Sequence, residues 1–332
     1  MTSVVHDSRV YLRHYLAPLQ AFLARDDVTD LYINRPGELW VESLGGAIER
    51  HDIAELTTAM LDRLARQIAA LAHQGISREH PLLSASLPDG ARIQIIAPPA
   101  TRGPMALAIR KHLSRELRLD DYAAAGAFDT IRRDAVPGHV ADDDTLARLK
   151  ADGDFAGLLK EAIRQRRNIL IAGGTATGKT TFLNALISEI AAEERLIVIE
   201  DTPELELRHA NAVGLVAARS PLGEAIADME QLLNASLRMR PDRIILGELR
   251  GPEAFTFLRA VNTGHPGSMT TIHADSPARA VEQIALLVLQ TGTRLDRDSV
   301  LHYVRSTVDV FVQLARTGGK RHVADIVLRS EA

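Results

Sequence analysis

The chain has 332 residues, of which 46% are hydrophobic and 25% are charged, so it can form two domains with sizeable cores. Its net charge of −4 and its aromatic content of 4% disfavour a basic, base-stacking nucleic-acid surface. The absence of cysteine excludes disulfides and cysteine-ligated zinc, and indicates a reducing compartment. No apolar run approaches the roughly 18 residues of a membrane span, and the first residues lack a secretory apolar core. We therefore expect a cytoplasmic protein.

The first 112 residues are expected to form a small α+β domain. Helical spacing of apolar residues occurs over 9–25 and over 55–75, where Gly75 is the expected C-cap. Residues 28–42 alternate like two strands around a turn at Arg35-Pro36-Gly37. A second expected hairpin turns at Pro88-Asp89-Gly90, and a further strand follows at 105–112.

Residues 113–150 are charged and rich in Ala and Gly without clear periodicity, and we assign them to a linker. A helix over 144–166 is expected to lead into a second domain, residues 151–332. In that domain, short apolar strands alternate with helical segments, which is typical of a mostly parallel α/β sheet with helices on its faces. The tail predicts a hairpin that turns at Gly318-Gly319.

A phosphate-binding loop is predicted by "GGTATGKTT", which matches G-x-x-x-x-G-K-[ST] between the apolar strand "NILIA" and the helix "TFLNALISEI". Glycines let successive N–H groups face the phosphates at the helix N-terminus. Lys179 is expected to reach the β- and γ-phosphates of ATP, and the Thr180 hydroxyl is expected to ligate Mg²⁺. The nucleotide-binding residues are therefore expected to be Gly173, Gly174, Thr175, Ala176, Thr177, Gly178, Lys179, Thr180 and Thr181.

Carboxylates end two further apolar strands. Glu248 follows "RIILG", and ligands of open α/β sheets bind beyond the carboxyl ends of the strands, so Glu248 is the expected water-activating base. Such folds usually place a magnesium-holding Asp one position earlier, where this chain has Gly247. Glu200 and Asp201, at the end of "RLIVIED", can supply the missing carboxylate, with a helix-capping role for the Asp as the alternative. Glu204 is equally consistent with a solvated surface charge.

Two histidines flank the strand "GSMTTIHA". His265 precedes the strand and His273 lies near its carboxyl end, roughly 25 Å apart at about 3.3 Å per residue, so they cannot share a metal ion. His265, between a glycine and a proline, is expected to be a turn or packing residue. His273 can donate a hydrogen bond to a γ-phosphate, with an ordinary polar strand end as the alternative.

Four ordered motifs together resemble one family: "GGTATGKTT", "IEDTPEL", "LRMRPDRIILGELRGPEA" and "NTGHPGSMTTIHA" occur in the order found in secretion-superfamily traffic ATPases. The N-terminal "VTDLYINRPGELWVE" and "LPDGARIQIIAPP" are similar to the type IV secretion and conjugal-transfer branch. The resemblance implies a C-terminal RecA-like domain, Mg-ATP hydrolysis and a hexameric ring of identical subunits. It also implies inner-membrane secretion-machine partners and leaves peripheral association with that membrane open.

The same resemblance assigns roles to individual residues. It implies that Glu248 activates water, that Glu200 and Asp201 serve Mg²⁺ and water, and that His273 senses the γ-phosphate. N-terminal-domain arginines reach the phosphates in this family, and their matches are Arg92 and Arg110, for which a solvated strand face is the alternative. Further candidates are Arg240, between subunits, and Arg250.

The function expected from these features is an ATPase motor that powers substrate transfer or pilus assembly in a type IV secretion or conjugation system. The alternative within the superfamily is a type II secretion or type IV pilus assembly or retraction ATPase. Many type II members carry a four-cysteine zinc module that this chain lacks, but retraction motors lack it too. Outside the superfamily, the charge and aromatic content disfavour a nucleic-acid motor, and no N-K-x-D segment supports a GTPase. A small-molecule kinase stays open.

Overall fold

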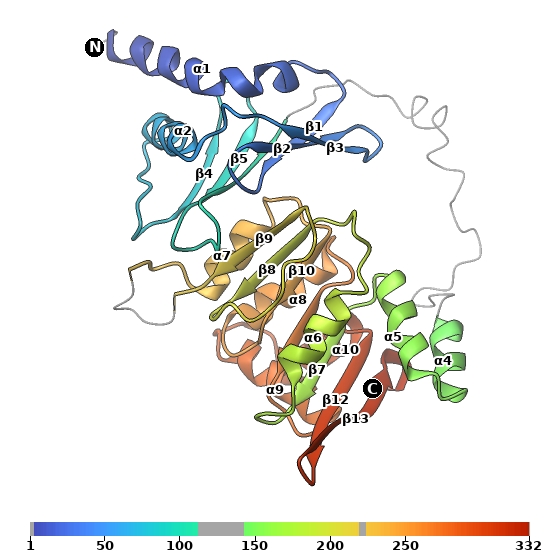
Figure 1. Ribbon diagram of the computed structural model, residues 1–332. Helices are drawn as coiled ribbons and strands as arrows, with labels where there is room; N and C mark the ends of the chain where they lie inside the picture. Colours follow the sequence, from blue (N-terminus) through green and yellow to red (C-terminus); the bar gives the residue numbers. More distant parts are fainter. Residues whose placement is uncertain (1–2, 112–142, 219–223, 332) are drawn as a thin grey trace, which may run out of the picture.

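The computed structural model describes residues 3–111, 143–218 and 224–331. Two layered units follow one another along the chain, a smaller N-terminal domain above a larger C-terminal domain in Figure 1. Within the described ranges, the first contains a six-stranded antiparallel sheet and the second a seven-stranded, mostly parallel sheet. The expected α/β fold class with a small α+β domain is confirmed.

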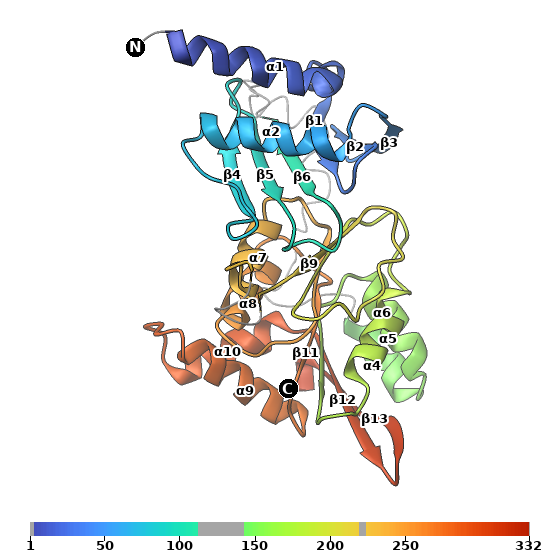
Figure 2. The same cartoon turned by 60° about the vertical axis from the view of Figure 1, so that its left-hand side comes forward.

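The described residues of the N-terminal domain, 3–111, form two helices and one sheet in the order β3-β2-β1-β6-β5-β4. Its helices are α1 Ser3–Leu23 and α2 Thr58–Leu71. Its strands are β1 Val28–Ile33, β2 Glu38–Ser43, β3 Ile48–Asp52, β4 Leu82–Ser86, β5 Arg92–Ile96 and β6 Ala106–Arg110. Both helices lie on the same face of this sheet, and α2 crosses the strands β4, β5 and β6 (Figure 2).

Period-two alternation gives this sheet two buried faces. Leu31 and Ile33 of β1 pack with α1 and α2, whereas Tyr32 between them packs with the core of the C-terminal domain. In β6, Leu107 joins the helix-covered core and Ala108 joins the other one. Because successive strand side chains point to opposite faces, the sheet binds its own helices on one side and the C-terminal domain on the other.

In the N-terminal domain, one prediction was wrong and one strand was not predicted. Helix α2 begins after Thr57, whose side chain accepts from Met60 N, but its last residue is Leu71 and its C-cap is Ala72, and His73 adopts the left-handed conformation (φ 53°). Gly75 is therefore not the C-cap. Strand β3 was not expected, because "IERHD" is a charged edge strand that is exposed except at the half-buried His51 and has no apolar alternation.

The expected helix 144–166 consists of two helices, α4 Asp143–Ala151 and α5 Phe155–Arg164. Gly153 between them has a φ of 75°, and Asp154 caps α5 by accepting from Gly157 N. Leu146 of α4 is buried in the same core as α5, so this stretch packs with the C-terminal domain. The start of the linker lies outside the described residues.

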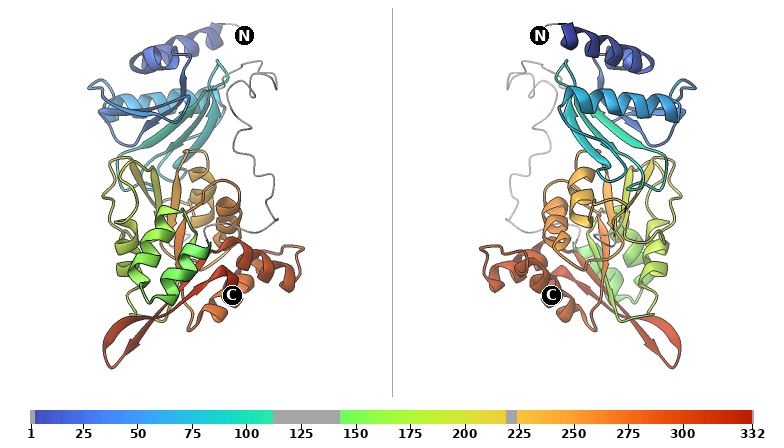
Figure 3. Two further views of the ribbon diagram at one scale, coloured as in Figure 1. Left: turned by 90° about the vertical axis from the view of Figure 1, so that its right-hand side faces the viewer. Right: turned by 90° about the vertical axis from the view of Figure 1, so that its left-hand side faces the viewer.

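The C-terminal sheet has the strand order β13-β12-β7-β11-β10-β8-β9, parallel except for the last strand, β13. Its strands are β7 Ile169–Gly173, β8 Leu196–Glu200, β9 Ala212–Val216, β10 Arg243–Leu246, β11 Met269–Ile272, β12 Val310–Thr317 and β13 Lys320–Leu328. The further helices are α6 Lys179–Ile187, α7 Met229–Ser236, α8 Glu253–Asn262, α9 Pro277–Leu289 and α10 Arg297–Thr307. The hairpin β12–β13 turns at Gly318 and Gly319, as predicted, and extends from the body of the domain (Figure 3).

Helices cover both faces of this sheet. Ile169 and Ile171 of β7 pack with α5 and α6, and the alternate residues Leu170 and Ala172 pack in the core that contains α7, α8, α9 and α10. Strands buried on both faces have continuous apolar sequences, which is why the sequence alone identified them. This arrangement directs the carboxyl ends of β7, β8, β10 and β11 to one edge of the sheet.

The two domains contact each other through polar and charged side chains as well as through apolar packing. The Arg195 guanidinium lies 4.1 Å from the centre of the Tyr32 ring and donates to Asn34 Oδ1 at 2.7 Å. Arg240 pairs with Glu42 at 2.8 Å. Arg240, a candidate for contacts between subunits, thus joins the two domains of the same chain here.

Candidate active site

The phosphate loop, residues 173–181, has a conformation suited to binding an anion. Ala176 and Gly178 have φ angles of 61° and 93°, and Gly178 directly precedes α6. A side chain at Gly173 would meet the Thr177 hydroxyl at 2.5 Å, so only glycine fits there. Together, the turn and the helix N-terminus form a backbone cradle for phosphate groups.

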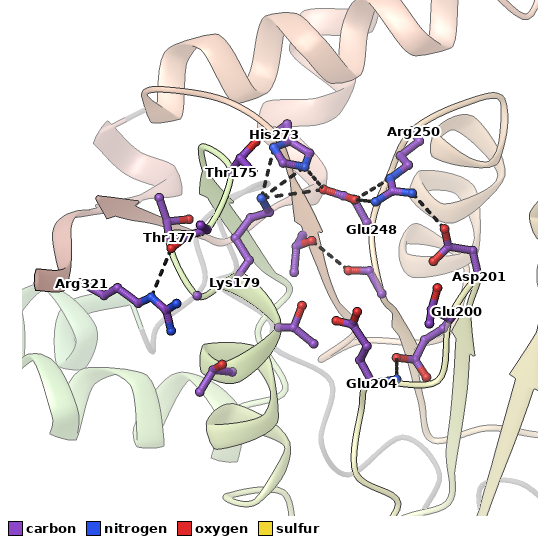
Figure 4. A pocket seen from close by; sticks show the side chains of 17 residues that line it. Thr175, Thr177, Lys179, Glu200, Asp201, Glu204, Glu248, Arg250, His273 and Arg321 are labelled. Atoms are coloured by element: carbon purple, nitrogen blue, oxygen red, sulfur yellow. Dashed lines mark hydrogen bonds and ion pairs between the residues drawn. The ribbon is translucent and has the colours of Figure 1, made fainter. Parts of the chain in front are cut away.

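The loop forms one wall of a pocket of about 480 Å³ at the carboxyl ends of the parallel strands. Figure 4 shows side chains from the phosphate loop, from the segments after β8, β10 and β11, and from β13 around this space. The residues that line the pocket are Thr175, Ala176, Thr177, Gly178, Lys179, Thr180, Thr181, Glu200, Asp201, Thr202, Glu204, Gly247, Glu248, Arg250, Thr271, His273 and Arg321. This volume lies within the range of about 300–1,000 Å³ that is usual for small-molecule sites.

Lys179 lies across the loop and over the carboxyl ends of the strands. Its Nζ donates to Gly173 O at 3.0 Å, lies 3.2 Å from His273 Nδ1 and is 3.8 Å from a Glu248 oxygen. Burial lowers the pKa of the Lys179 ammonium, whereas the adjacent Glu248 opposes that change. The ammonium thus lies inside the pocket, in contact with a loop carbonyl, His273 and Glu248.

Glu248 is at the centre of a group of charged side chains. One of its oxygens is 2.9 Å from His273 Nε2 and the other pairs with Arg250. Arg250 also contacts Asp201 at 2.9 Å, so one guanidinium connects the carboxylates that follow β8 and β10. The Glu248 side chain is only 14% exposed, which limits its solvent contact. The carboxylate is thereby held between Lys179, His273 and Arg250 at the carboxyl ends of the strands.

Glu200, in contrast, does not extend into the pocket with free oxygens. Its side chain is 3% exposed, and Oε1 accepts the backbone N–H groups of Glu204 and Leu205 at 3.0 and 2.8 Å. Oε2 pairs with the Arg102 guanidinium of the N-terminal domain. An added Cβ at Gly247 would lie 3.1 Å from Glu200 Cγ, so a larger side chain at this position would require Glu200 to shift.

Comparison with known proteins identifies the family. Residues 144–324 match the family described as Type II/IV secretion system protein. The chain belongs to this family. The resemblance inferred from the four motifs is therefore confirmed.

Relatives over nearly the full length are type IV secretion proteins. VirB11 of Bartonella henselae is 38% identical over 94% of this chain and 91% of its own length. PtlH of Bordetella pertussis is 37% identical over 99% of this chain and 98% of its own length. The crystal structure of the VirB11 ATPase from the Brucella suis type IV secretion system, in complex with sulphate, matches with a TM-score of 0.91. That match is 36% identical and covers 98% of this chain and 97% of the other.

Within this family member, the two histidines occupy different environments, as the sequence indicated. His273 lines the phosphate pocket, whereas His265 is near the opposite end of β11, with its Nδ1 3.1 Å from Pro241 O. Burial lowers the pKa of His265, which favours its neutral form. Its position is that of a packing residue.

The arginines predicted to reach the phosphates lie elsewhere in this structure. Arg92 and Arg110 are register partners on β5 and β6, and Arg110 donates to Asp30 at 2.8 Å. Both line a separate pocket of about 610 Å³, together with Arg238 of the C-terminal domain. The structure therefore does not bring them to the phosphate loop of their own chain, and their role stays a prediction.

Sequence reasoning missed Arg321. This residue of β13 donates from Nε to Ala176 O at 3.1 Å, and its Cδ would lie 3.2 Å from a Cβ at Gly178. Strand β12 pairs in parallel with β7, which brings the β12–β13 hairpin beside the phosphate loop. No local motif around Arg321 indicates this position, because it depends on long-range strand pairing.

The described part of the chain offers neither a metal cluster nor a membrane span. No group of three or more His, Asp or Glu side chains converges there as a metal site, and no helix combines the length and apolarity needed to cross a bilayer. Mg²⁺ in nucleotide sites uses few protein ligands together with phosphate oxygens and water. Thr180 and Asp201, which both line the pocket, fit that chemistry.

Proposed function

We propose that the pocket at the phosphate loop hydrolyses ATP with Mg²⁺, and that this reaction drives a type IV secretion or conjugation machine. One observation carries the proposal: Glu248, Lys179 and His273, from three different elements, converge beside an intact phosphate loop. The full-length relatives named as type IV secretion proteins support the choice of machine over the type II and pilus alternative.

The loop amides and Lys179 are proposed to bind the triphosphate. In the structure, Lys179 Nζ contacts two carbonyls of the loop, Gly173 O and Gly174 O. Phosphate oxygens carry more negative charge than these carbonyls. When ATP binds, the Lys179 ammonium therefore exchanges its contacts with the carbonyls for contacts with the β- and γ-phosphates. His273, 3.2 Å from Lys179 Nζ, then faces the γ-phosphate and donates to it.

Glu248 is proposed to activate the attacking water. Arg250 fixes one carboxylate oxygen, which leaves the other, near His273 and Lys179, to accept a proton from water. A positioned general base contributes on the order of 10²- to 10⁴-fold to such a step. The proton moves to Glu248 as the water oxygen bonds to the γ-phosphorus, while the bond between that phosphorus and the β–γ bridging oxygen breaks and ADP leaves.

Thr180 and Asp201 are proposed to hold the magnesium ion, which supplies charge stabilisation to the phosphate oxygens when bound. Glu200 was expected to share this task, but both of its oxygens are engaged by Arg102 and by backbone N–H groups. We propose that Glu200 instead fixes the acidic loop, residues 201–205, in which Asp201 lies.

The working form is proposed to be a ring of identical subunits, a hexamer by family resemblance, that contacts membrane components of the secretion machine. Arg92 and Arg110 lie away from their own phosphate loop, beside Arg238. A role for them at a γ-phosphate therefore requires domain movement or a neighbouring subunit. Measuring the mass of the protein with and without an ATP analogue tests the ring.

The direct test of hydrolysis is steady-state phosphate release by the wild type and by Lys179→Ala. We expect the variant to lose nucleotide binding or turnover, because the loop then lacks its only ammonium among the pocket-lining residues that the structure describes. Unchanged turnover in Lys179→Ala would remove the phosphate loop from the reaction. Release of phosphate without any acceptor would exclude a kinase, and tight, length-dependent DNA binding at physiological salt would instead favour a nucleic-acid motor.

A further inference from the structure

Arg102 lies in the N-terminal domain, yet its side chain ends beneath the phosphate pocket of the other domain. The docking segment, residues 100–102, lies along the outer strand β9 of the C-terminal sheet. Arg102 N donates to Gly214 O and Val216 N donates to Ala100 O, each at 2.9 Å. These bonds add the docking segment to the open edge of the sheet as a short extra strand.

The absence of a side chain at Gly214 leaves space for the Arg102 side chain at this edge. A Cβ at Gly214 would lie 2.6 Å from Arg102 Cδ and 2.7 Å from Leu207 Cδ1. The guanidinium is thereby directed inward, with a side chain only 18% exposed, although arginine usually remains at the surface. Burial lowers the pKa of Arg102, so its charge requires a partner.

That partner is Glu200, which also holds the acidic loop. Arg102 pairs with Glu200 Oε2, and its NH1 donates to Leu205 O at 2.7 Å. Glu200 Oε1 accepts from Leu205 N at 2.8 Å and from Glu204 N at 3.0 Å. Leu205 is therefore held at its carbonyl by one domain and at its amide by the other. The acidic loop fixed in this way carries Asp201 into the phosphate pocket.

We propose that Arg102 is a positioning residue that couples docking of the N-terminal domain to the geometry of the acidic loop. This inference rests on the proposed ATP hydrolysis at the same pocket. With Arg102 in place, Glu200 is neutralised and bound to the loop. When the N-terminal domain moves away, Arg102 leaves with it, the Glu200 charge loses its partner, and the loop that carries Asp201 is released.

The first experiment measures the loop without relying on turnover. Amide hydrogen exchange is compared between the wild type, Arg102→Met and the control Arg78→Met. Arg78 is also an N-terminal-domain arginine that pairs with a C-terminal-domain glutamate, Glu224, but both side chains are exposed. We expect peptides covering 203–216 to exchange at least about tenfold faster in Arg102→Met, and to be unchanged in Arg78→Met. Unchanged exchange of these peptides in Arg102→Met overturns the proposal.

The second experiment separates positioning from loss of fold. In Arg102→Met, kcat for ATP should fall on the order of ten- to a hundredfold while KM changes less than about threefold, because a misplaced group near the chemistry slows turnover without removing the phosphate cradle. Arg102→Lys should recover part of the loss. If Arg102 acts through Glu200, the double variant Arg102→Met/Glu200→Gln should turn over no more slowly than Glu200→Gln alone. If the fold losses of kcat in the two single variants multiply in the double variant, Arg102 does not act through Glu200.

A variant on the other side of the contact covers the case in which Arg102→Met does not fold. Gly214→Ala places a methyl group 2.6 Å from the present position of Arg102 Cδ, which should displace the guanidinium and give the same faster exchange over 203–216. Normal exchange in a folded Gly214→Ala would contradict the proposal. Failure of the wild type to release phosphate would refute the proposed function, while the exchange comparison would still decide the role of Arg102.

Discussion

Replacing Glu248 by Gln is the most informative change at the candidate active site. The substitution keeps the size of the side chain and removes only its charge and its capacity to accept a proton. In the structure, one oxygen of Glu248 is 2.9 Å from His273 Nε2 and 3.8 Å from Lys179 Nζ. We therefore expect the turnover rate to fall and the affinity for ATP to stay the same or rise.

Turnover should fall on the order of 10²- to 10³-fold, because the attacking water loses its base, which corresponds to roughly 3–4 kcal/mol of activation free energy. The affinity for ATP should stay the same or increase. At 3.8 Å, the attraction between Lys179 and Glu248 is roughly 4 kcal/mol for an effective dielectric constant of 20, and its loss frees the ammonium for phosphate. The substitution also removes one negative charge from the pocket, which reduces the repulsion of the triphosphate.

The assay combines steady-state phosphate release with equilibrium titration of ATP into Glu248→Gln. Glu206→Gln is the matched control, because Glu206 pairs with Arg208 on the surface and does not line the pocket. The control should turn over at the wild-type rate. Turnover of Glu248→Gln within about threefold of the wild type would refute the assignment of Glu248 as the base, and a large loss of ATP affinity would refute the electrostatic argument.

Two further changes test the arginines. If these side chains act at the γ-phosphate, Arg92→Ala or Arg110→Ala should slow turnover and leave the affinity for ADP unchanged. Stopped-flow turnover and titration of ADP measure the two quantities. An equal loss of ADP and ATP binding would indicate damage to folding instead. Arg321→Ala removes a charged contact to Ala176 O and should weaken ATP and ADP binding roughly five- to thirtyfold by calorimetry, since such bonds contribute about 1–2 kcal/mol. Arg316→Ala, on the exposed part of the paired strand, is its control, and equal affinities in the two variants would remove Arg321 from the site.

The sequence predicted the central site because its residues follow local rules. Lys179 lies in a fixed motif, and Glu248 and His273 each follow an apolar strand of a parallel sheet. The carboxyl ends of such strands meet at one edge, so the convergence of these residues follows from strand order and the phosphate loop. The assignment of their chemical roles stays a prediction.

What the sequence could not predict depends on long-range contacts. Arg321 reaches the loop only because β12 pairs with β7, and Glu200 is occupied only because Arg102 arrives from the other domain. A charged edge strand such as β3 has no apolar alternation to reveal it. Gly247, which departs from the usual acidic motif, lies beside Glu200, and an added Cβ would be 3.1 Å from Glu200 Cγ.

The most direct test of the account is calorimetric titration of Mg-ATP into the folded protein, with Lys179→Ala measured in parallel. We predict saturable heat for the wild type, with binding lost or strongly weakened in the variant, because the triphosphate is bound by the backbone cradle and its lysine. Absence of heat with wild-type protein whose circular dichroism shows a folded chain would contradict the central claim that this pocket binds ATP.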